Sequence, residues 1–419
     1  MAESLIIVHA NELVTLKGPR RSRTRAEMSN LAVVKDGALV IEDGVIIDVG
    51  RTDSILKEHG RSRREVIDAQ GKTVTPGFVD CHTHLIFAGS REFEIELKAK
   101  GKSYMEILRE GGGILRTVKD TRHASPDSLF HQSARRLRSM IAHGSTTIEA
   151  KSGYGLDAEV EIRMLETVQK LGRSMPVAAV PTYLGAHAVP PEYSGKPDEY
   201  IEFIIAKVLP IVARRKLAEF CDVFCEKGVF SPEQSKLVLL EARRLGLKLK
   251  VHADEFKPSG GAELAAEVGA ISADHLMRTS DDGIMAMARK DVNGVLLPGT
   301  PYTSMSKEYA DGRRLIDLGV PIALGTDLSP NCWNESMQFT ISLACHKMRM
   351  TPAEALTAAT INAAAALGLE KRIGSIERGK RADVIVLDVP SHEHIPYRFG
   401  TNLCSLVVKD GRKAWERQD

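Results

Sequence analysis

The sequence predicts an α/β protein, a (β/α)8 TIM-like barrel inserted in a small β-sandwich domain that is built from both termini. Eight short strand-like runs alternate with helical stretches in the middle of the 419-residue chain. Strands that alternate with helices form parallel βα units, and eight such units close a barrel. Both ends of the chain are instead rich in strands and turns. We therefore expect residues 1–73 and 375–419 to form the small β domain and residues 74–374 to form the barrel.

The terminal strands are marked by Asp-Gly pairs that separate apolar runs, which is the sequence signal of a β-hairpin turn. Near the N-terminus these pairs are Asp36-Gly37 and Asp43-Gly44. Near the C-terminus the same signal recurs at Asp410-Gly411. We expect each of the three pairs to form a turn between two strands of the small domain.

The predicted barrel strands are short β-rich runs that end in polar residues. They span residues 73–84, 145–155, 176–187, 221–230, 247–255, 270–276, 293–300 and 320–330. Two of the helices that follow have clear start signals, an N-cap residue followed by proline, at Ser231-Pro232 and Thr351-Pro352. The second signal begins an alanine-rich helix that we expect to stop near Gly368.

His82 and His84 are the most informative pair in the middle region. Alternate residues of a strand point to the same face, so both imidazoles can reach one point. Because they end a barrel strand, that point lies at the C-terminal mouth, the usual active-site face. Two surface histidines could give the same spacing, so the pair gains its weight from four residues at later strand ends. These residues are His187, His252, His275 and Asp327.

Several imidazoles and one carboxylate at the same mouth predict a metal site. Neutral imidazoles with a carboxylate suit zinc or iron, and three or four protein ligands leave one position for water. A metal in such a site lowers the pKa of that water to about 7. The pattern therefore indicates metal-assisted hydrolysis or deamination.

Charged residues beside these strand ends are candidates for proton transfer. Glu255 follows His252 by three residues, where it could take a proton from the attacking water, and the alternative is a solvated loop acid. His275 could polarise the scissile carbonyl or orient the water, or it could be structural. Glu226 ends the fourth strand, where a second metal ligand could sit, and Lys151 is expected to be structural or a substrate-side charge.

Composition and charge exclude several other classes of protein. The chain has 57 basic and 55 acidic residues, and this net charge of +2 gives no electrostatic argument for binding nucleic acid or an anionic membrane. No run approaches 18 apolar residues, and the N-terminus lacks the pattern of a secretory signal. Six cysteines without a CxxC pair predict reduced thiols in a cytoplasmic enzyme.

The segment 76–91, together with His252, His275 and Asp327, resembles the amidohydrolase superfamily. The resemblance covers nearly the whole chain, and it is closer to the imidazolonepropionase family of histidine degradation. The segments that carry the closer resemblance are 88–91, 151–156, 184–188, 222–226, 252–256 and 272–276.

This resemblance implies metal-dependent hydrolysis of the ring amide C–N bond of 4-imidazolone-5-propanoate to N-formimidoyl-L-glutamate. It implies one zinc or iron ion per chain, held by His82, His84, His252 and Asp327. It implies that the catalytic residues are Glu255, His275 and Asp327. It implies substrate contacts from Arg91, Tyr154, His187, Glu255, Ser329, Asn331 and Cys332. An arginine fork suits the substrate carboxylate, because it can bind both carboxylate oxygens.

The loop after the eighth strand departs from the family pattern. The family usually follows this aspartate with one residue and then Asn-Pro-Gly, whereas here Asp327 is followed by Leu328-Ser329-Pro330-Asn331. We still expect residues 328–332 to contact the substrate or the product.

Two other functions share part of the pattern. An aminohydrolase (deaminase) acting on a purine or pyrimidine would use similar ligands and release ammonia, but Arg91 and the segment 152–156 argue against it. A barrel that lost its metal and became a binding protein is disfavoured, since every expected ligand is present. Metal content and ammonia release would separate the three functions. The expected partners are a small substrate carrying a carboxylate and a second copy of the chain in a homodimer.

Overall fold

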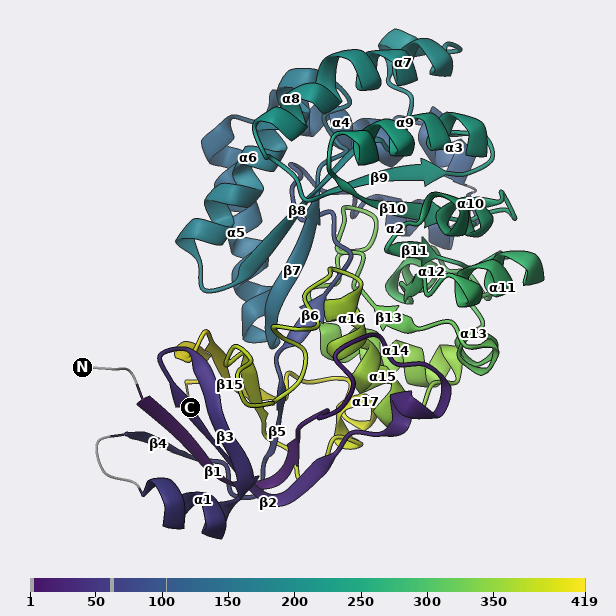
Figure 1. The fold of residues 1–419 in the computed structure, drawn as a ribbon. Helices are drawn as coiled ribbons and strands as arrows, with labels where there is room; N and C mark the ends of the chain where they lie inside the picture. The colour runs from purple at the N-terminus through teal and green to yellow at the C-terminus, as the bar shows by residue number, and fades with distance from the viewer. Residues whose placement is uncertain (1–3, 61–63, 103, 419) are drawn as a thin grey trace.

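The computed structural model describes residues 4–60, 64–102 and 104–418. Within them the strands form two eight-stranded sheets, one parallel and barrel-like and one mixed. Figure 1 shows the barrel with its helices in the upper part of the molecule and the mixed sheet at lower left, where both termini lie. The predicted fold class is confirmed, and the predicted boundaries at residues 73/74 and 374/375 stay a prediction.

The barrel strands follow one another in chain order, and each is parallel to its neighbour. They are β6 (Phe78–Asp80), β7 (Ser145–Lys151), β8 (Ala178–Ala186), β9 (Phe220–Cys225), β10 (Lys248–Ala253), β11 (Ser272–His275), β12 (Asn293–Leu296) and β13 (Ile322–Leu324). The barrel closes just beyond the ends of β6 and β13. There Thr83 and Leu328 form a parallel bridge, and the Asp327 N–H donates to the His82 carbonyl at 3.1 Å.

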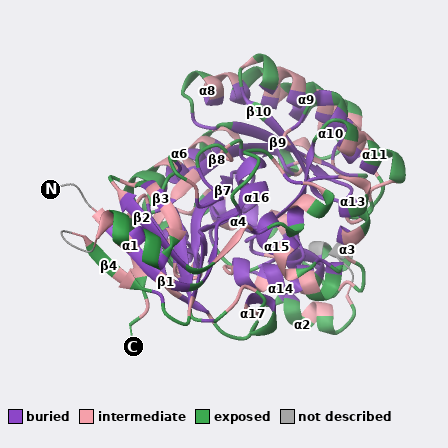
Figure 2. Ribbon diagram, turned by 60° about the horizontal axis from the view of Figure 1, so that its bottom comes forward, coloured by how far each residue is buried: buried purple, intermediate pink, exposed green. Residues whose placement is uncertain are grey.

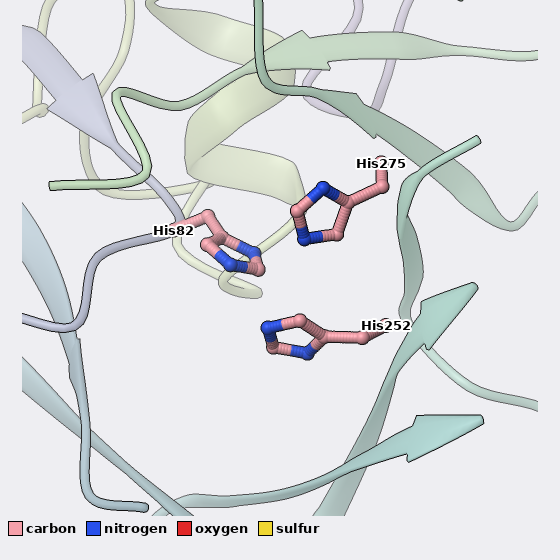
Figure 3. Close-up of side chains that lie close together, drawn as sticks. All are labelled: His82, His252 and His275. Carbon is pink, nitrogen blue, oxygen red and sulfur yellow. The ribbon is translucent and has the colours of Figure 1, made fainter. Parts of the chain in front are cut away.

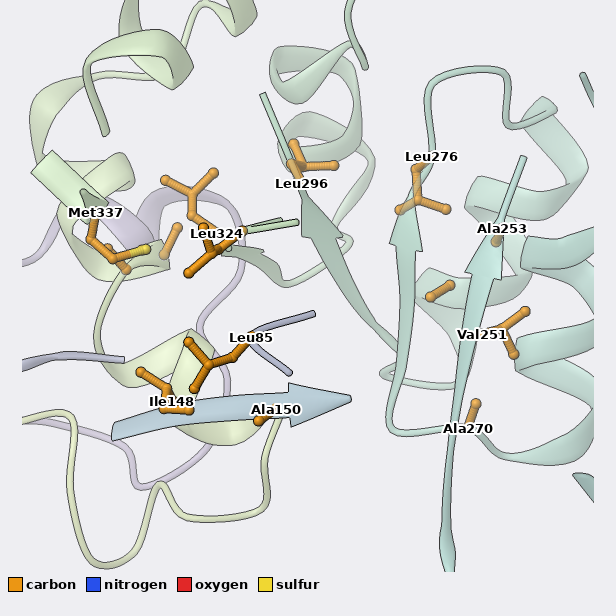
Figure 4. Close-up of a cluster of buried hydrophobic side chains, with 14 of the residues drawn as sticks. Leu85, Ile148, Ala150, Val251, Ala253, Ala270, Leu276, Leu296, Leu324 and Met337 are labelled. Carbon is orange, nitrogen blue, oxygen red and sulfur yellow. The ribbon is translucent and has the colours of Figure 1, made fainter. Parts of the chain in front are cut away.

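Side chains along β7 and β10 alternate between an apolar outer layer and polar residues that point into the barrel. Ile148 and Ala150 of β7 belong to one apolar core cluster with Val251 and Ala253 of β10 (Figure 4). The residues between them are charged or polar and point the other way, because successive side chains of a strand face opposite sides. The polar residues of several strands therefore meet inside the barrel.

Helices surround the barrel, and Figure 2 shows buried residues along the strands and exposed residues on the outward faces of the helices. The α-helices of the described residues are α1 (Thr52–His59), which lies beside β2 and β3, α2 (Glu94–Ala99), α3 (Tyr104–Arg109), α4 (Gly113–His123), α5 (Pro126–Ala142), α6 (Ala158–Ser174), α7 (Pro197–Phe203), α8 (Leu209–Arg214), α9 (Pro232–Arg244), α10 (Gly261–Val268), α11 (Asp281–Arg289), α12 (Gly299–Thr303), α13 (Gly312–Leu318), α14 (Met337–Met348), α15 (Pro352–Ala358), α16 (Ile361–Ala365) and α17 (His394–Tyr397). The 3-10 helices η1 (Arg25–Ser29) and η2 (Pro191–Tyr193) and the π-helix η3 (Ile204–Val208) complete the set. Among the described residues, none of these helices combines the length and apolar character needed to cross a membrane.

Helices α9 and α15 begin at their predicted start signals. The Ser231 side chain accepts the Gln234 N–H, and the Thr351 side chain accepts the Glu354 N–H. In both helices the side chain at the third position returns a hydrogen bond to the N-cap backbone, which completes a capping box.

The alanine-rich helix does not run to Gly368, so that prediction is wrong. It is broken between α15 and α16 at Thr360, whose φ of −131° and ψ of −93° are not helical. The Asn362 side chain accepts the Arg23 N–H at 2.8 Å and donates to the Ile322 carbonyl at 2.8 Å. These contacts with distant segments hold the chain away from a continuous helix.

The mixed sheet joins the two ends of the chain. Its strands are β1 (Ser4–Val14), β2 (Val33–Glu42), β3 (Val45–Arg51), β4 (Glu65–Asp68), β5 (Thr73–Pro76), β14 (Val384–Leu387), β15 (Cys404–Lys409) and β16 (Arg412–Glu416). The order is β16-β15-β14-β5-β1-β2-β3, with β4 beside β1. Antiparallel pairing of β5 with β14 links the N-terminal strands to the C-terminal ones.

Two of the three predicted Asp-Gly turns are confirmed. Asp43-Gly44 connects β2 to β3, and Asp410-Gly411 connects β15 to β16. The prediction for Asp36-Gly37 is wrong, because this pair lies inside β2, where Gly37 pairs with Ala10. A Cβ at Gly37 would lie 2.3 Å from the Leu13 Cβ, so glycine is required here by the close approach of β1.

Candidate metal centre

Six buried side chains meet at the C-terminal mouth of the barrel. Figure 3 shows the rings of His82, His252 and His275 pointing toward one another from three parts of the barrel. Three overlapping groups place one ligand atom of each residue within 4.8 Å of the others. The groups are His82, His252 and His275; His84, His187 and His252; and His82, His84 and Asp327.

The four predicted ligands present atoms that a cation would satisfy. Oδ1 of Asp327 lies 3.5 Å from Nε2 of both His82 and His84. Nε2 of His84 lies 3.3 Å from Nε2 of His252. Nε2 of His82 is buried and has no hydrogen-bond partner among the described residues. Buried polar atoms normally have partners, so this arrangement of nitrogens and one carboxylate fits zinc or iron.

Burial favours the neutral, metal-binding form of His82, His84 and His275 by lowering the pKa of each ring. Desolvation, followed by the charge of Lys151, lowers the pKa of His82 well below its ordinary value. Desolvation also lowers the pKa of His84 and His275 well below the ordinary value. It raises the pKa of Asp327 to about 6, although the Thr300 hydroxyl, which donates to Oδ2, opposes the rise.

Two carboxylates stand behind the ligand histidines on the side of the barrel interior. Nδ1 of His82 lies 2.6 Å from Oδ2 of Asp274, which fixes the proton on Nδ1 and leaves the Nε2 lone pair free. Nδ1 of His252 lies 2.9 Å from Oδ2 of Asp222, an ion-pair contact without hydrogen-bond geometry. Sequence reasoning missed both aspartates, although each occupies an inward position of a barrel strand.

A cavity of about 100 Å³ opens beside these residues. Most predicted substrate and catalytic residues line it, namely Arg91, Tyr154, His187, Glu255, His275, Asp327, Ser329 and Asn331. Sequence reasoning missed four further lining residues, Ile114, Phe224, Phe256 and Thr300. Cys332 does not line the cavity, because its Sγ lies 3.5 Å from the Thr326 carbonyl and its side chain is buried.

Arg91 is fixed at the rim of the cavity by a buried carboxylate. Its Nε and Nη2 donate to Oε1 and Oε2 of Glu94 at 2.7 and 2.8 Å. Oε1 of Glu94 also accepts the Gly113 N–H at 2.7 Å, so Glu94 ties the arginine to the start of α4. The spacing of three residues between Arg91 and Glu94 is the only sequence signal for this pair.

The loop that carries Tyr154 is held by one buried glutamate. The Glu161 carboxylate accepts N–H groups of Gly153, Gly155 and Leu156 at 2.7–3.1 Å. The Gly153 carbonyl accepts a hydrogen bond from Nδ1 of His187 at 3.0 Å. Burial lowers the pKa of His187 to about 3, so its ring is neutral and Nε2 is an acceptor.

Glu255 and Glu226 have different environments. Oε2 of Glu255 lies 3.8 Å from Nε2 of His275, and burial raises its pKa well above the ordinary value. The Glu226 carboxylate accepts the Phe256 N–H at 2.9 Å and the Ser259 hydroxyl at 2.7 Å. Glu226 therefore holds the loop that carries Glu255, and no metal-binding group found among the described residues includes it.

Lys151 does not face the cavity. Its Nζ lies 2.7 Å from Oδ2 of Asp222 and 2.9 Å from Oε1 of Glu149, and all three side chains are fully buried. Of the two roles predicted for Lys151, the structural one is therefore confirmed.

Comparison with known proteins adds sequence relatives and fold relatives. The sequence model of the amidohydrolase family matches residues 73–414. Imidazolonepropionase of Geobacillus kaustophilus (strain HTA426) is 51% identical over 412 residues, which cover 97% of this chain and 97% of that protein. Imidazolonepropionase of Clostridium tetani (strain Massachusetts / E88) is 46% identical over 415 residues, which cover 99% of each chain.

Two solved structures share the fold at low sequence identity. Guanine deaminase of E. coli has a TM-score of 0.72 at 16% identity, with 99% of each chain covered. The 5-methylcytosine deaminase from Klebsiella pneumoniae, liganded with phosphonocytosine, has a TM-score of 0.74 at 15% identity, again with 99% of each chain covered.

Proposed function

The chain belongs to the amidohydrolase family, as one of its imidazolonepropionases, and from this membership we infer that its reaction takes place in the cavity beside the six-residue cluster. The reaction is hydrolysis of the ring amide C–N bond of 4-imidazolone-5-propanoate to N-formimidoyl-L-glutamate. The observation that carries this function is a single cavity whose lining combines residues able to bind a metal ion with the buried Glu255 and the oriented guanidinium of Arg91.

We propose that one zinc or iron ion per chain is held by Nε2 of His82, His84 and His252 and by Oδ1 of Asp327. Support comes from Nε2 of His82, which is buried without a hydrogen-bond partner among the described residues, and from the 3.3 Å separation between Nε2 of His84 and Nε2 of His252. When bound, such an ion lowers the pKa of water and polarises the substrate carbonyl. Thr300 keeps the second oxygen of Asp327 occupied, so that Oδ1 alone faces the imidazoles.

Proton transfer is assigned to Glu255, His275 and Asp327. The attacking water must lose a proton, and the departing ring nitrogen must gain one. Oε2 of Glu255 accepts the proton of the attacking water. Nε2 of His275, which lies 3.8 Å from this oxygen, orients the water. Glu255 then gives this proton to Asp327, which passes it to the leaving ring nitrogen, so that the proton lost by the water ends on the product nitrogen. The raised pKa of Glu255, caused by burial and then by Asp327, suits a group that must hold a proton briefly.

Substrate recognition is assigned to other residues of the cavity lining. Arg91 binds the propanoate carboxylate, because Glu94 already orients the guanidinium. Nε2 of His187 accepts an N–H of the substrate ring, and Tyr154 packs beside it, with ring centroids 5.3 Å apart. The loop after β13 contributes contacts from Ser329 and Asn331, and Cys332 supports this loop, because its N–H donates to the Ser329 hydroxyl at 3.1 Å.

The direct test is to incubate purified protein with freshly prepared imidazolone propanoate and to follow loss of its ultraviolet absorbance. We expect turnover that a chelator abolishes and that added zinc or iron restores. No ammonia should be released. Ammonia release from a purine or pyrimidine, with no turnover of the imidazolone, would favour a deaminase, and absence of metal and of both reactions would favour a binding protein.

Arg91→Met is expected to raise KM while metal content stays unchanged. A charged pair that leaves a buried partner behind costs about 2–5 kcal/mol when it is broken, or about 30- to 5,000-fold in affinity. Steady-state kinetics and elemental analysis measure the two quantities. Because Glu94 would lose its partner, the double variant with Glu94→Gln separates substrate binding from this local effect.

Arg116→Met is the matched control for Arg91, since Arg116 lies on α4 and pairs with Asp120 at 2.9 Å outside the cavity lining. An unchanged KM in Arg91→Met would place the carboxylate elsewhere. The nearest candidates are then the 328–332 loop and Lys98, whose Nζ donates to the Asn331 side chain at 2.8 Å.

We propose that the chain acts as a homodimer in the cytoplasm. All six cysteines are free thiols, which suits a reducing compartment. Light scattering should give twice the chain mass of 45.9 kDa. A mass of one chain at micromolar concentration would contradict the dimer.

A further inference from the structure

The barrel interior behind the candidate metal centre contains a layer of charged residues. This charged layer consists of Glu149 and Lys151 on β7, Asp222 on β9, Lys250 on β10 and Asp274 on β11, and each of these side chains is 0% exposed. Barrel interiors are usually filled by branched apolar residues. Burial of charges is costly, and apolar residues of similar volume often give equal or greater stability. Stability alone therefore does not explain the charged layer.

The two lysines connect the carboxylates of this layer. Nζ of Lys151 lies 2.7 Å from Asp222, 2.9 Å from Glu149 and 3.8 Å from Asp274. Nζ of Lys250 lies 3.1 Å from Glu149 and 3.6 Å from Asp274. Lys151 is thus within ion-pair distance of both aspartates, which come from different strands.

The same aspartate oxygens contact the candidate metal ligands. Oδ2 of Asp274 lies 3.8 Å from Lys151 and 2.6 Å from Nδ1 of His82. Oδ2 of Asp222 lies 2.7 Å from Lys151 and 2.9 Å from Nδ1 of His252. A carboxylate behind an imidazole orients the ring, and the hydrogen bond between Asp274 and His82 also fixes the proton on Nδ1 of that ring. The Lys151 ammonium group therefore contacts both of the aspartates that lie behind His82 and His252.

We propose that Lys151 is a positioning residue for the metal site. By holding Asp222 and Asp274 together, it orients His82 and His252 as one unit, with each Nε2 directed to the ion. His82 follows β6 and His252 lies on β10, the first and fifth strands of the eight, so the two side chains approach the site from opposite sides of the barrel. The inference rests on the ligand set proposed above.

Positioning and simple electrostatics predict opposite signs for loss of this lysine. Replacement of Lys151 by an uncharged residue removes a positive charge that repels the metal cation. Loss of this Coulomb repulsion alone would make metal binding tighter. Positioning predicts weaker binding, because Asp222 and Asp274 lose their common partner. Mutation of such outer partners typically lowers metal affinity about 10–100-fold.

The test is the zinc affinity of metal-free Lys151→Met, measured by competition with a chromophoric chelator. We expect an affinity about 10–100-fold below that of the wild-type protein. The matched control is Lys380→Met, which removes the same atoms from another buried lysine. Nζ of Lys380 donates to the carbonyls of Glu370 and Ile373 at 2.6 and 3.1 Å, outside the charged layer. The control should bind zinc as the wild type does.

A double variant tests the route through the aspartate. If Lys151 acts through Asp222, Lys151→Met with Asp222→Asn should weaken zinc binding by less than the product of the two single effects. The absorption spectrum of bound cobalt should change in Lys151→Met and stay unchanged in Lys380→Met, because it reports ligand geometry. If Lys151→Met does not fold, Lys151→Gln is measured in the same way.

The outcomes separate this inference from the proposed function. Equal or tighter zinc binding by Lys151→Met would overturn the positioning role. So would a double variant whose loss of zinc affinity equals the product of the losses in Lys151→Met and Asp222→Asn. Failure of the wild-type protein itself to bind zinc or iron would instead overturn the proposed ligand set. Weaker binding with an altered cobalt spectrum supports the positioning role.

Discussion

Glu255→Gln is expected to lower kcat by about 10²–10⁴, the usual range for loss of a general acid or base, with metal content unchanged. Glutamine keeps the shape of the side chain but cannot accept the proton of the attacking water. Glu255 lines the cavity beside His275 and is not one of the proposed metal ligands. The substitution therefore removes proton transfer and leaves the ligand set intact. The measurement is kcat together with metal content of the purified variant.

The pH dependence of kcat provides a second readout for Glu255. Burial, and then the charges of Asp327 and Glu226, raise the pKa of Glu255 well above the ordinary value. The ionised carboxylate is the active form, so kcat of the wild-type protein should fall as the pH falls through this raised pKa. In Glu255→Gln this acidic limb should disappear from the profile.

His275→Asn is the comparison that identifies the base. If Glu255→Gln keeps a kcat near that of the wild type, Glu255 is not the base and His275 becomes the leading candidate. His275→Asn is itself expected to lower kcat by about 10²–10⁴ and to keep its metal. Loss of metal from this variant would make His275 a ligand, and the proposed ligand set would be wrong.

His252→Ala is expected to lose nearly all bound metal, and activity with it. His252 belongs to two of the three groups of ligand atoms, and its Nε2 lies 3.3 Å from that of His84. Alanine removes this nitrogen and leaves the buried Asp222 facing a void. Elemental analysis should find about one zinc or iron per wild-type chain and almost none in the variant.

His346→Ala is a matched control for His252, because His346 lies on α14, where Nε2 contacts the Pro396 carbonyl at 3.3 Å. It should keep its metal and its kcat. Two metal ions per wild-type chain would contradict the single-ion set and return Glu226 to consideration as a bridging ligand.

Local patterns in the sequence were sufficient to predict the fold and the position of the cluster. Alternation of strands and helices needs only neighbouring residues, and so do the capping signals at Ser231 and Thr351, both of which the structure confirms. The spacing of His82 and His84 places both on one face of one strand end. Parallel barrel strands bring their ends to one mouth, so His252 and Asp327 could be expected to join them.

The tertiary structure alone decided which distant residues support that cluster. Asp274 contacts His82 across 192 residues of sequence, and Asp222 contacts Lys151 across 71. The break before Asn362 and the position of Gly37 inside β2 likewise depend on partners far along the chain. Periodicity and caps are short-range properties that a few residues encode, whereas these contacts exist only after the barrel closes and after the sheet pairs the two ends of the chain.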